Sequence, residues 1–128
     1  SDAVSGALGS VQRGDVASLV SKGGSTTEIV AMLEAFNTKA VPIIAVTEKP
    51  NSLLGTASSV VVPVSVQREA DEFNMLATTS TMAVVAFFDA VCIAVMRETG
   101  YTREQFAVIH PGGAVGERLT GGSTTKEE

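Results

Sequence analysis

The chain has 128 residues, of which 45% are hydrophobic and 18% charged, and its formal net charge is −5. This length fits one domain, and the apolar content excludes an intrinsically disordered chain. The 9 basic residues are scattered and outnumbered by 14 acidic ones, so we expect no nucleic-acid surface and no binding to anionic membranes.

Cys92 and His110 are the only residues of their kinds in the sequence. A single cysteine excludes a disulfide framework and a cysteine metal cluster, so we expect no metal centre and a reducing, cytoplasmic compartment. No signal peptide is visible. The longest apolar stretch, 82–96, contains Asp89 and is shorter than the roughly 20 residues of a membrane span, so no membrane segment is expected.

Three short apolar segments are predicted as strands: residues 16–20, 41–46 and 60–66. Apolar runs of this length are typical of strands that are covered on both faces by helices. Pro63 has no N–H for a ladder, so we expect the third strand at a sheet edge or at a bulge.

A helix is predicted between the first two strands. Residues 25–28 have the form of a capping box, with Ser25 as the N-cap and Glu28 reaching back to it. The apolar residues that recur at helical spacing are Ile29, Val30, Leu33 and Phe36. Residues 37–39 end this run.

A long helix is predicted from about Met75 to Glu98, with Gly100 as its C-terminal stop. Because it is apolar nearly all round, we expect it in the core, in a subunit interface, or in both. A second capping box at residues 102–105 starts a shorter helix.

The predicted order is helix, strand, helix, strand, short helix, strand, long helix. Such alternation indicates an α/β fold with parallel strands joined by right-handed crossovers. Three strands are few for this class, and Ser1 falls inside a helix or loop. We therefore expect either that one or two N-terminal β-α units are missing from the chain or that a partner chain covers their place. The domain is predicted over residues 1–120, followed by a disordered polar tail over 121–128.

The first candidate site is the loop between the first strand and the next helix. Its glycines allow close approach to a ligand, and hydroxyls, helix-start N–H groups and the Lys22 ammonium are able to converge on an anion at the sheet edge where ligands bind. It is not a P-loop, since GxxxxGK[ST] is absent. From the residues alone, an ordinary glycine turn with a helix cap is an equally good interpretation. The loop reads Ser21-Lys22-Gly23-Gly24-Ser25-Thr26-Thr27.

Two further candidates follow the third strand. Glu69, within residues 67–72, stands where a carboxylate is able to act as a general base, although spacing alone favours a solvated charged loop. The hydroxyls of residues 78–81 open the long helix, where capping is the better interpretation and ligand binding the alternative.

The fourth candidate is the only histidine, His110, followed by a proline and three glycines within residues 111–116. This composition indicates a shaped loop that presents an imidazole able to shuttle protons near neutral pH. A buried structural histidine is an equally good interpretation.

Taken together, these segments resemble the sugar isomerase (SIS) domain family, and within it the arabinose 5-phosphate isomerase branch. The segments that carry the resemblance are 21–28 with the strand 41–47, then 64–70 with 77–81, and 110–116. The last, His-Pro-Gly-Gly-Ala-Val-Gly, is the most specific. The resemblance covers about residues 2–119.

The resemblance implies an α/β three-layer sandwich with a parallel, flavodoxin-like or Rossmann-like sheet, in a homodimer or homotetramer with a site partly shared between subunits. It implies aldose–ketose isomerisation of a phosphorylated sugar such as arabinose 5-phosphate through an enediol, with no cofactor. The implied catalytic residues are Glu69 and His110. The implied phosphate ligands are Ser21, Lys22, Gly24, Ser25 and Thr26. Further implied sugar contacts are Thr78, Thr79 and Ser80.

The chain also departs from the family pattern. Lys22 and Gly23 stand where the phosphate loop usually has Asn-Ser, and Ser25 replaces a glutamate. Residues 5–9 read Ser-Gly-Ala-Leu-Gly in place of His-Gly-Asp-Leu-Gly, and residues 71–72 read Asp-Glu in place of Cys-Pro. The retained carboxylate and histidine favour an isomerase, whereas the lost histidine and glutamate favour a non-catalytic sugar-phosphate sensor.

Overall fold

The computed structural model describes residues 6–110 and residue 118. The chain forms two compact units, Ser1–Ala86 and Phe87–Glu128. The first unit holds the sheet, and the long helix begins in the first unit and ends in the second.

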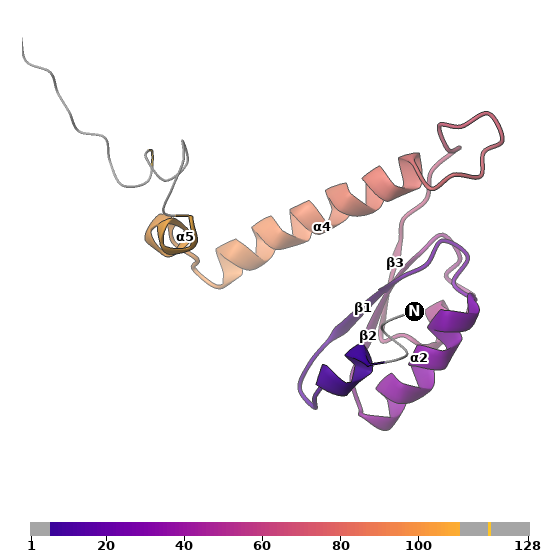
Figure 1. Ribbon diagram of the computed structural model, residues 1–128, viewed down its shortest axis with the longest axis horizontal. Helices are drawn as coiled ribbons and strands as arrows, with labels where there is room; N and C mark the ends of the chain where they lie inside the picture. The colour runs from indigo at the N-terminus through magenta and orange to yellow at the C-terminus, as the bar shows by residue number, and fades with distance from the viewer. Residues whose placement is uncertain (1–5, 111–117, 119–128) are drawn as a thin grey trace, which may run out of the picture. The chain divides into compact units, whose positions relative to one another are not determined.

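The first unit contains a three-stranded parallel sheet in the order β1-β2-β3 (Figure 1). Its strands are β1 (Ala17–Val20), β2 (Ile43–Thr47) and β3 (Val60–Pro63). The predicted α/β class and parallel strands are confirmed. Strand β3 lies at an edge of this sheet, as its proline predicts, and Pro63 pairs with Thr47 at the very end of the ladder.

Helices α2 (Thr27–Thr38) and α3 (Leu53–Ala57) pack on the same face of the sheet. Ile29 and Phe36 lie two turns apart on one side of α2 and are both buried, which explains why this side faces the strands. Leu54 of α3 is completely buried. The strand-side members of this core are Leu19, Val41, Ile43 and Ala45.

The opposite face of the sheet is more open. Val20 of β1 is 46% exposed there and Val60 of β3 is 51% exposed. Apolar strand residues of this kind are typical of a face that a further layer covers, as in the three-layer arrangement that the sequence predicts.

The predicted start of α2 is wrong. Its N-cap is Thr26 and not Ser25, and no side chain forms a cap hydrogen bond there. Because the helix begins at Thr27, Glu28 falls too early in the first turn to reach back in a capping box.

The end of α2 explains why β2 begins later than predicted. Ala40 has a positive φ of 53°, and the Val41 N–H donates to the Phe36 carbonyl at 3.0 Å. This is the hydrogen bond of a Schellman motif, in which glycine usually occupies the position of Ala40. The chain turns here, and only after Pro42 does it enter β2.

The segment before β1 contains a short 3-10 helix, η1 (Ala7–Ser10). Lys39, at the end of α2, donates from Nζ to the carbonyls of Leu8 at 2.6 Å and Val11 at 2.8 Å. Lys39 thus holds the segment before β1 against the end of α2.

The long helix α4 (Thr79–Glu98) ends where the sequence predicts. Gly100 has a φ of 64°, and the Tyr101 N–H donates to the Met96 carbonyl at 2.9 Å, which closes the helix in a second Schellman motif. The predicted start at about Met75 is wrong, because the helix begins at Thr79.

No residue of α4 is buried against the described part of the chain, and its predicted place in a core stays a prediction. The predicted subunit interface stays a prediction. By length and composition alone α4 is able to cross a membrane, which is weak evidence, because buried helices of soluble proteins share that composition. Its exposed large apolar residues are Met82, Val85, Val91, Ile93, Val95 and Met96.

Helix α5 (Arg103–Ile109) begins with the predicted capping box. The Gln105 N–H donates to the Thr102 hydroxyl at 3.2 Å, and the Thr102 N–H donates to the Gln105 side chain at 2.9 Å. The predicted tail, 121–128, and the loop residues 111–116 lie outside the described residues. The domain bounds of 1–120 stay a prediction.

Candidate functional site

The loop after β1 is fixed by backbone hydrogen bonds and by packing. The buried Ser21 hydroxyl accepts from the Gly24 N–H at 3.1 Å. The Lys22 carbonyl accepts from the Thr47 hydroxyl at 3.1 Å, and the Gly24 carbonyl accepts from the Leu54 N–H at 2.9 Å. The end of β2 and the start of α3 thus hold the loop in one shape.

Gly24 is required at its position for two reasons. Its φ is 67°, a left-handed conformation that residues with a Cβ seldom adopt. A Cβ there would also overlap the Ser52 hydroxyl and lie 3.1 Å from the Thr47 hydroxyl. Gly24 therefore serves the predicted site through its backbone.

The start of α2 presents polar groups that the rest of the described chain leaves unpaired. Ser25 and Thr26 are exposed, and neither hydroxyl has a hydrogen-bond partner among the described residues. The first N–H groups of any helix lack intrahelical partners and favour anions. Geometry thus makes this helix start suitable for a phosphate.

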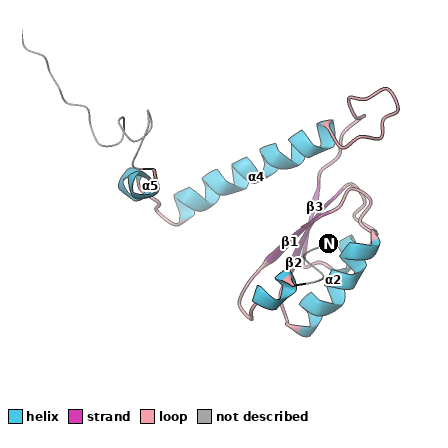
Figure 2. Cartoon of the chain, in the orientation of Figure 1, coloured by secondary structure: helices cyan, strands magenta, loops and turns pink. Residues whose placement is uncertain are grey.

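Glu69 lies in the long loop between β3 and α4, which contains neither helix nor strand (Figure 2). Its side chain is only 1% exposed, so the interpretation as a solvated charged loop is wrong. Oε1 accepts from Lys22 Nζ at 2.7 Å. Oε2 accepts from the Thr78 N–H at 3.1 Å, the Thr78 hydroxyl at 3.2 Å and the Ser80 N–H at 3.1 Å.

These donors determine the ionisation of Glu69. The hydrogen bond from Lys22, then those from Ser80 and the Thr78 N–H, hold the pKa of Glu69 far below its usual range, although burial opposes them. The same hydrogen bond raises the pKa of Lys22. At neutral pH both groups are charged, and a carboxylate with so low a pKa is a weak base.

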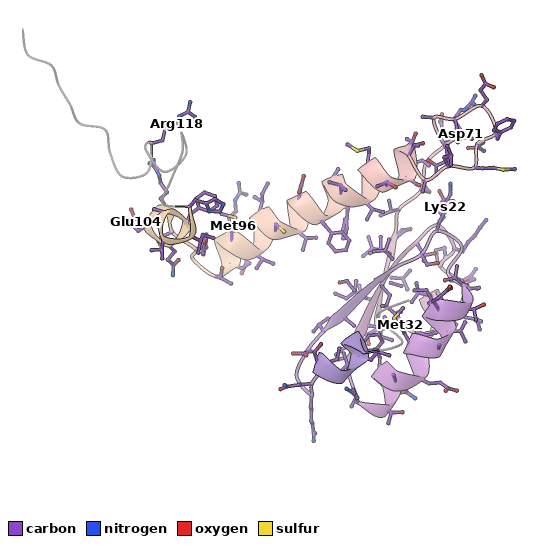
Figure 3. All side chains as sticks on the ribbon, viewed as in Figure 1. Lys22, Met32, Asp71, Met96, Glu104 and Arg118 are labelled. Atoms are coloured by element: carbon purple, nitrogen blue, oxygen red, sulfur yellow. The ribbon has the colours of Figure 1, made fainter. Side chains whose placement is uncertain are left out.

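Lys22 connects the two loops. Figure 3 shows its side chain pointing from the loop after β1 toward the segment that carries Asp71. Its Nζ also lies 3.9 Å from Glu48 Oε1, and that same oxygen accepts from the Val66 N–H at 3.2 Å. Strand β3 ends at Pro63, so the predicted end at Val66 is wrong, and the Val66 N–H bonds to Glu48 outside the ladder.

Glu69 and Asp71 organise the loop before α4, which begins at Thr79 and not at Met75. Glu69 Oε2 accepts from the Ser80 N–H, which a helix from Met75 would bond to the Leu76 carbonyl, and the Asn74 side chain accepts from the Glu69 N–H at 2.6 Å. Burial alone would raise the pKa of Asp71, but the backbone N–H groups of this loop lower it below its usual range. The donors to Asp71 are Phe73 at 3.1 Å, Met75 at 3.0 Å and Leu76 at 2.9 Å.

A cavity of about 240 Å³ opens between the carboxyl ends of β1 and β2 and the first turns of α4. Ser21 and Lys22 of the loop after β1 therefore face the same space as the start of α4, whereas Gly24, Ser25 and Thr26 do not line it. Its polar lining consists of Ser21, Lys22, Thr47, Ser80 and Thr81, and its apolar lining consists of Val20, Val46, Val64, Ala77, Val84 and Val85. Thr79 lines a more open hollow of about 510 Å³ together with Glu69.

His110 belongs to the second unit, whereas Glu69 belongs to the first. His110 is exposed at the C-terminal end of α5, so the interpretation as a buried histidine is wrong. Its ring stacks on Phe106, with centroids 4.3 Å apart and planes 12° from parallel. A catalytic role for His110 stays a prediction.

Sequence reasoning missed Thr47 and Glu48. The Thr47 hydroxyl contacts the Lys22 carbonyl, and the Glu48 carboxylate lies between Lys22 and Val66. Thr47 ends β2, and Glu48 directly follows it. The rule that ligand-binding loops follow the carboxyl ends of parallel strands would have found them.

Metal ligation finds no support in the described part of the chain, where no cluster of three or more His, Cys, Asp or Glu side chains is suited to hold an ion. Cys92 is exposed and unpaired in α4. The lysine, hydroxyls and backbone N–H groups of the site fit an anion instead.

Solved structures with the same fold include two that are similar over most of this chain. A proposed sugar-phosphate isomerase of Listeria monocytogenes str. 4b F2365 is 51% identical, with a TM-score of 0.82, over 87% of this chain and 58% of that one. The Escherichia coli CFT073 protein c3406, solved in complex with arabinose 5-phosphate, is 33% identical, also with a TM-score of 0.82, over 86% of this chain and 58% of that one.

Curated relatives agree with these structures. The arabinose 5-phosphate isomerase KdsD of Shigella flexneri is 37% identical over 119 residues, which are 93% of this chain and 36% of the relative. The arabinose 5-phosphate isomerase GutQ of Escherichia coli K12 is 36% identical over 118 residues, which are 92% of this chain and 37% of the relative. The chain thus spans little more than a third of the length of these relatives. The SIS domain model matches residues 1–94, and the chain belongs to the SIS domain family.

Proposed function

We propose that the protein binds a phosphorylated sugar and interconverts its aldose and ketose forms. The observation that carries the proposal is the contact between Lys22 of the phosphate loop and the buried carboxylate of Glu69. A cation suited to phosphate and a carboxylate suited to proton transfer lie within one hydrogen bond of each other.

The phosphate is assigned to the start of α2. The hydroxyls of Ser25 and Thr26, the helix-start N–H groups and the Lys22 ammonium supply its donors. Ser21 and Gly24 shape the loop, through the hydrogen bond between them and the left-handed conformation of Gly24. Thr78, Thr79 and Ser80 lie near Glu69 and are assigned to the sugar hydroxyls.

Glu69 is assigned as the base. Its carboxylate takes the proton from the hydroxyl-bearing carbon next to the carbonyl, the C–H electron pair forms the double bond of an enediolate, and the negative charge moves to the former carbonyl oxygen. The proton of the neighbouring hydroxyl passes to the former carbonyl oxygen, and Glu69 returns its proton to the former carbonyl carbon, which completes the isomerisation. His110 is assigned to ring opening or proton shuttling, from its own subunit or a neighbouring one. This chemistry needs no cofactor.

Arabinose 5-phosphate is the first substrate to test, because the curated relatives are named for it and c3406 was solved with it. The exposed apolar residues of α4 support a homodimer or homotetramer. The unpaired Cys92 fits a reducing, cytoplasmic compartment.

The alternative function is a sugar-phosphate sensor without catalysis. Ser25 stands where the family's phosphate loop has a glutamate, and the Lys22 contact leaves Glu69 a weak base. A sensor needs only the phosphate site and a response to its occupation.

Calorimetry and NMR with the whole protein distinguish these functions. Ser25→Ala with Thr26→Ala should weaken binding of arabinose 5-phosphate by about 1–3 kcal/mol, through lost charge-assisted hydrogen bonds.

In deuterated water, the isomerase should incorporate deuterium at the carbon next to the carbonyl, and Glu69→Gln should stop this while binding is retained. Binding without exchange in the unaltered protein would establish the sensor, and unchanged affinity in the double variant would remove the phosphate assignment.

A further inference from the structure

The two carboxylate oxygens of Glu69 are held by different kinds of donor. Oε2 accepts from Thr78 and Ser80, whose backbone N–H groups are fixed by the start of α4. Oε1 accepts from Lys22, a flexible side chain that is 47% exposed and comes from another loop. Oε1 can therefore be released without disturbing α4, whereas Oε2 cannot.

The backbone of Lys22 is fixed by hydrogen bonds, whereas its ammonium is carried by a flexible side chain and lies near two carboxylates. Its carbonyl accepts from the Thr47 hydroxyl at 3.1 Å and the Glu48 N–H at 3.2 Å. The four-carbon side chain lines the same cavity as Ser21 and Ser80. Rotation about the bonds of this side chain moves the ammonium while the backbone of Lys22 stays in place.

We propose that Lys22 is a positioning residue that couples phosphate binding to the release of Glu69. Lys22 holds Glu69 Oε1 until a sugar phosphate binds, and its ammonium then moves to the phosphate. This inference rests on the proposed function and adds a substrate-triggered base to it.

The charges around Glu69 give the release its consequence. Glu48 and Asp71 are the other acids whose charges act on Lys22, and Arg68 donates from its guanidinium to the backbone carbonyls of Glu69 and Asp71, at 3.3 Å each. Once Lys22 leaves, the carboxylate stays buried but has lost its cation, which favours its protonated form. The pKa of Glu69 therefore rises on phosphate binding, and Glu69 becomes a stronger base when a substrate is present.

The test follows the ionisation of Glu69 directly. The whole protein is labelled with 13C at the glutamate side-chain carboxyl, and the Glu69 resonance is assigned by its loss in Glu69→Gln. Its pH titration is recorded alone, with saturating inorganic phosphate and with saturating arabinose 5-phosphate. We expect the midpoint to move upward with either ligand, and in Lys22→Met to lie high already and to stay unchanged on binding. Binding by Lys22→Met should be weaker by about 10-fold, and Lys22→Arg should restore both behaviours in part.

Each outcome decides between the proposals. Sugar-phosphate binding with an unchanged Glu69 midpoint in the unaltered protein overturns the coupling and leaves the proposed function standing. Absence of sugar-phosphate binding overturns both. The matched control is Lys49→Met, because Lys49 is exposed on the same edge and its ammonium has no ion pair among the described residues. It should keep the titration and the affinity, and a Lys49→Met response equal to that of Lys22→Met would show a general charge effect and overturn the assignment to Lys22.

Discussion

The loops after β1 and β3 meet at one edge of the sheet but are held in shape by different forces. The loop after β1 is short, and Gly24, with its backbone contacts to β2 and α3, determines its path. The loop after β3 is long, and two carboxylates, Glu69 and Asp71, organise it by accepting backbone N–H groups. The first loop should therefore respond to changes of shape and the second to changes of charge.

The largest expected effect concerns the shape of the first loop. Gly24→Ala should lower the free energy of unfolding by about 2–4 kcal/mol, because a Cβ is strained at this φ and overlaps the Ser52 hydroxyl. Chemical denaturation measures this, with calorimetry for the loss of sugar-phosphate binding.

Two variants separate the causes of that effect. Gly23→Ala is the matched control, since a Cβ at Gly23 meets no atom within 4 Å. In Gly24→Ala with Ser52→Gly the overlap with Ser52 is gone and the left-handed φ remains, so part of the stability should return. Equal losses in Gly23→Ala and Gly24→Ala would show that the described path of this loop is wrong.

A smaller effect is expected from acid, and it should come from the second loop. The pKa of Glu69 is lower in the folded protein than the ordinary 4.5, so its contribution to stability is present above about pH 4.5 and is lost as pH falls through the folded value. Asp71 acts in the same direction. Thermal unfolding between pH 7 and pH 3 should therefore show a steeper loss of stability in the unaltered protein than in Glu69→Gln. Parallel curves would contradict the charge-based account.

The smallest effect lies outside both loops and provides a reference. Ala40→Gly should raise the free energy of unfolding by about 0.5–1 kcal/mol, because relief of the positive φ exceeds the added freedom of the unfolded chain. Denaturation midpoints measure the gain, and sugar-phosphate affinity should not change. A loss of stability would mean that Ala40 is not strained.

The fold could be predicted from sequence where local patterns dominate. The apolar strands, Pro63 at an edge and the capping box at Thr102 depend on short-range rules, and the structure confirms them. The failures occur where distant side chains compete with those rules. Glu69 takes the Ser80 N–H, which a helix from Met75 would bond to the Leu76 carbonyl, and no spacing in the sequence shows this.

Most residues of the candidate site could be predicted from the sequence, but the contacts between them could not. The glycine-rich loop was visible because its residue types are unusual, and Glu69 was visible because of the family resemblance. The contact between Lys22 and Glu69 joins residues 47 positions apart, so only a folded chain shows it. Glu48, which lies beside this pair, carries no sequence signal except its place after β2.

The strand order has a consequence for how the first unit folds. Because β1, β2 and β3 are neighbours in sequence order, right-handed connections place both crossover helices, α2 and α3, on the same face. Segments that are close in sequence therefore cover one face of the sheet early in folding. The other face, which carries Val20 and Val60, is covered only by segments distant in sequence or by a second subunit. Covering of this second face should be a late event in folding, slowed by the entropy of closing long loops. It should also depend on protein concentration if a second subunit covers the face.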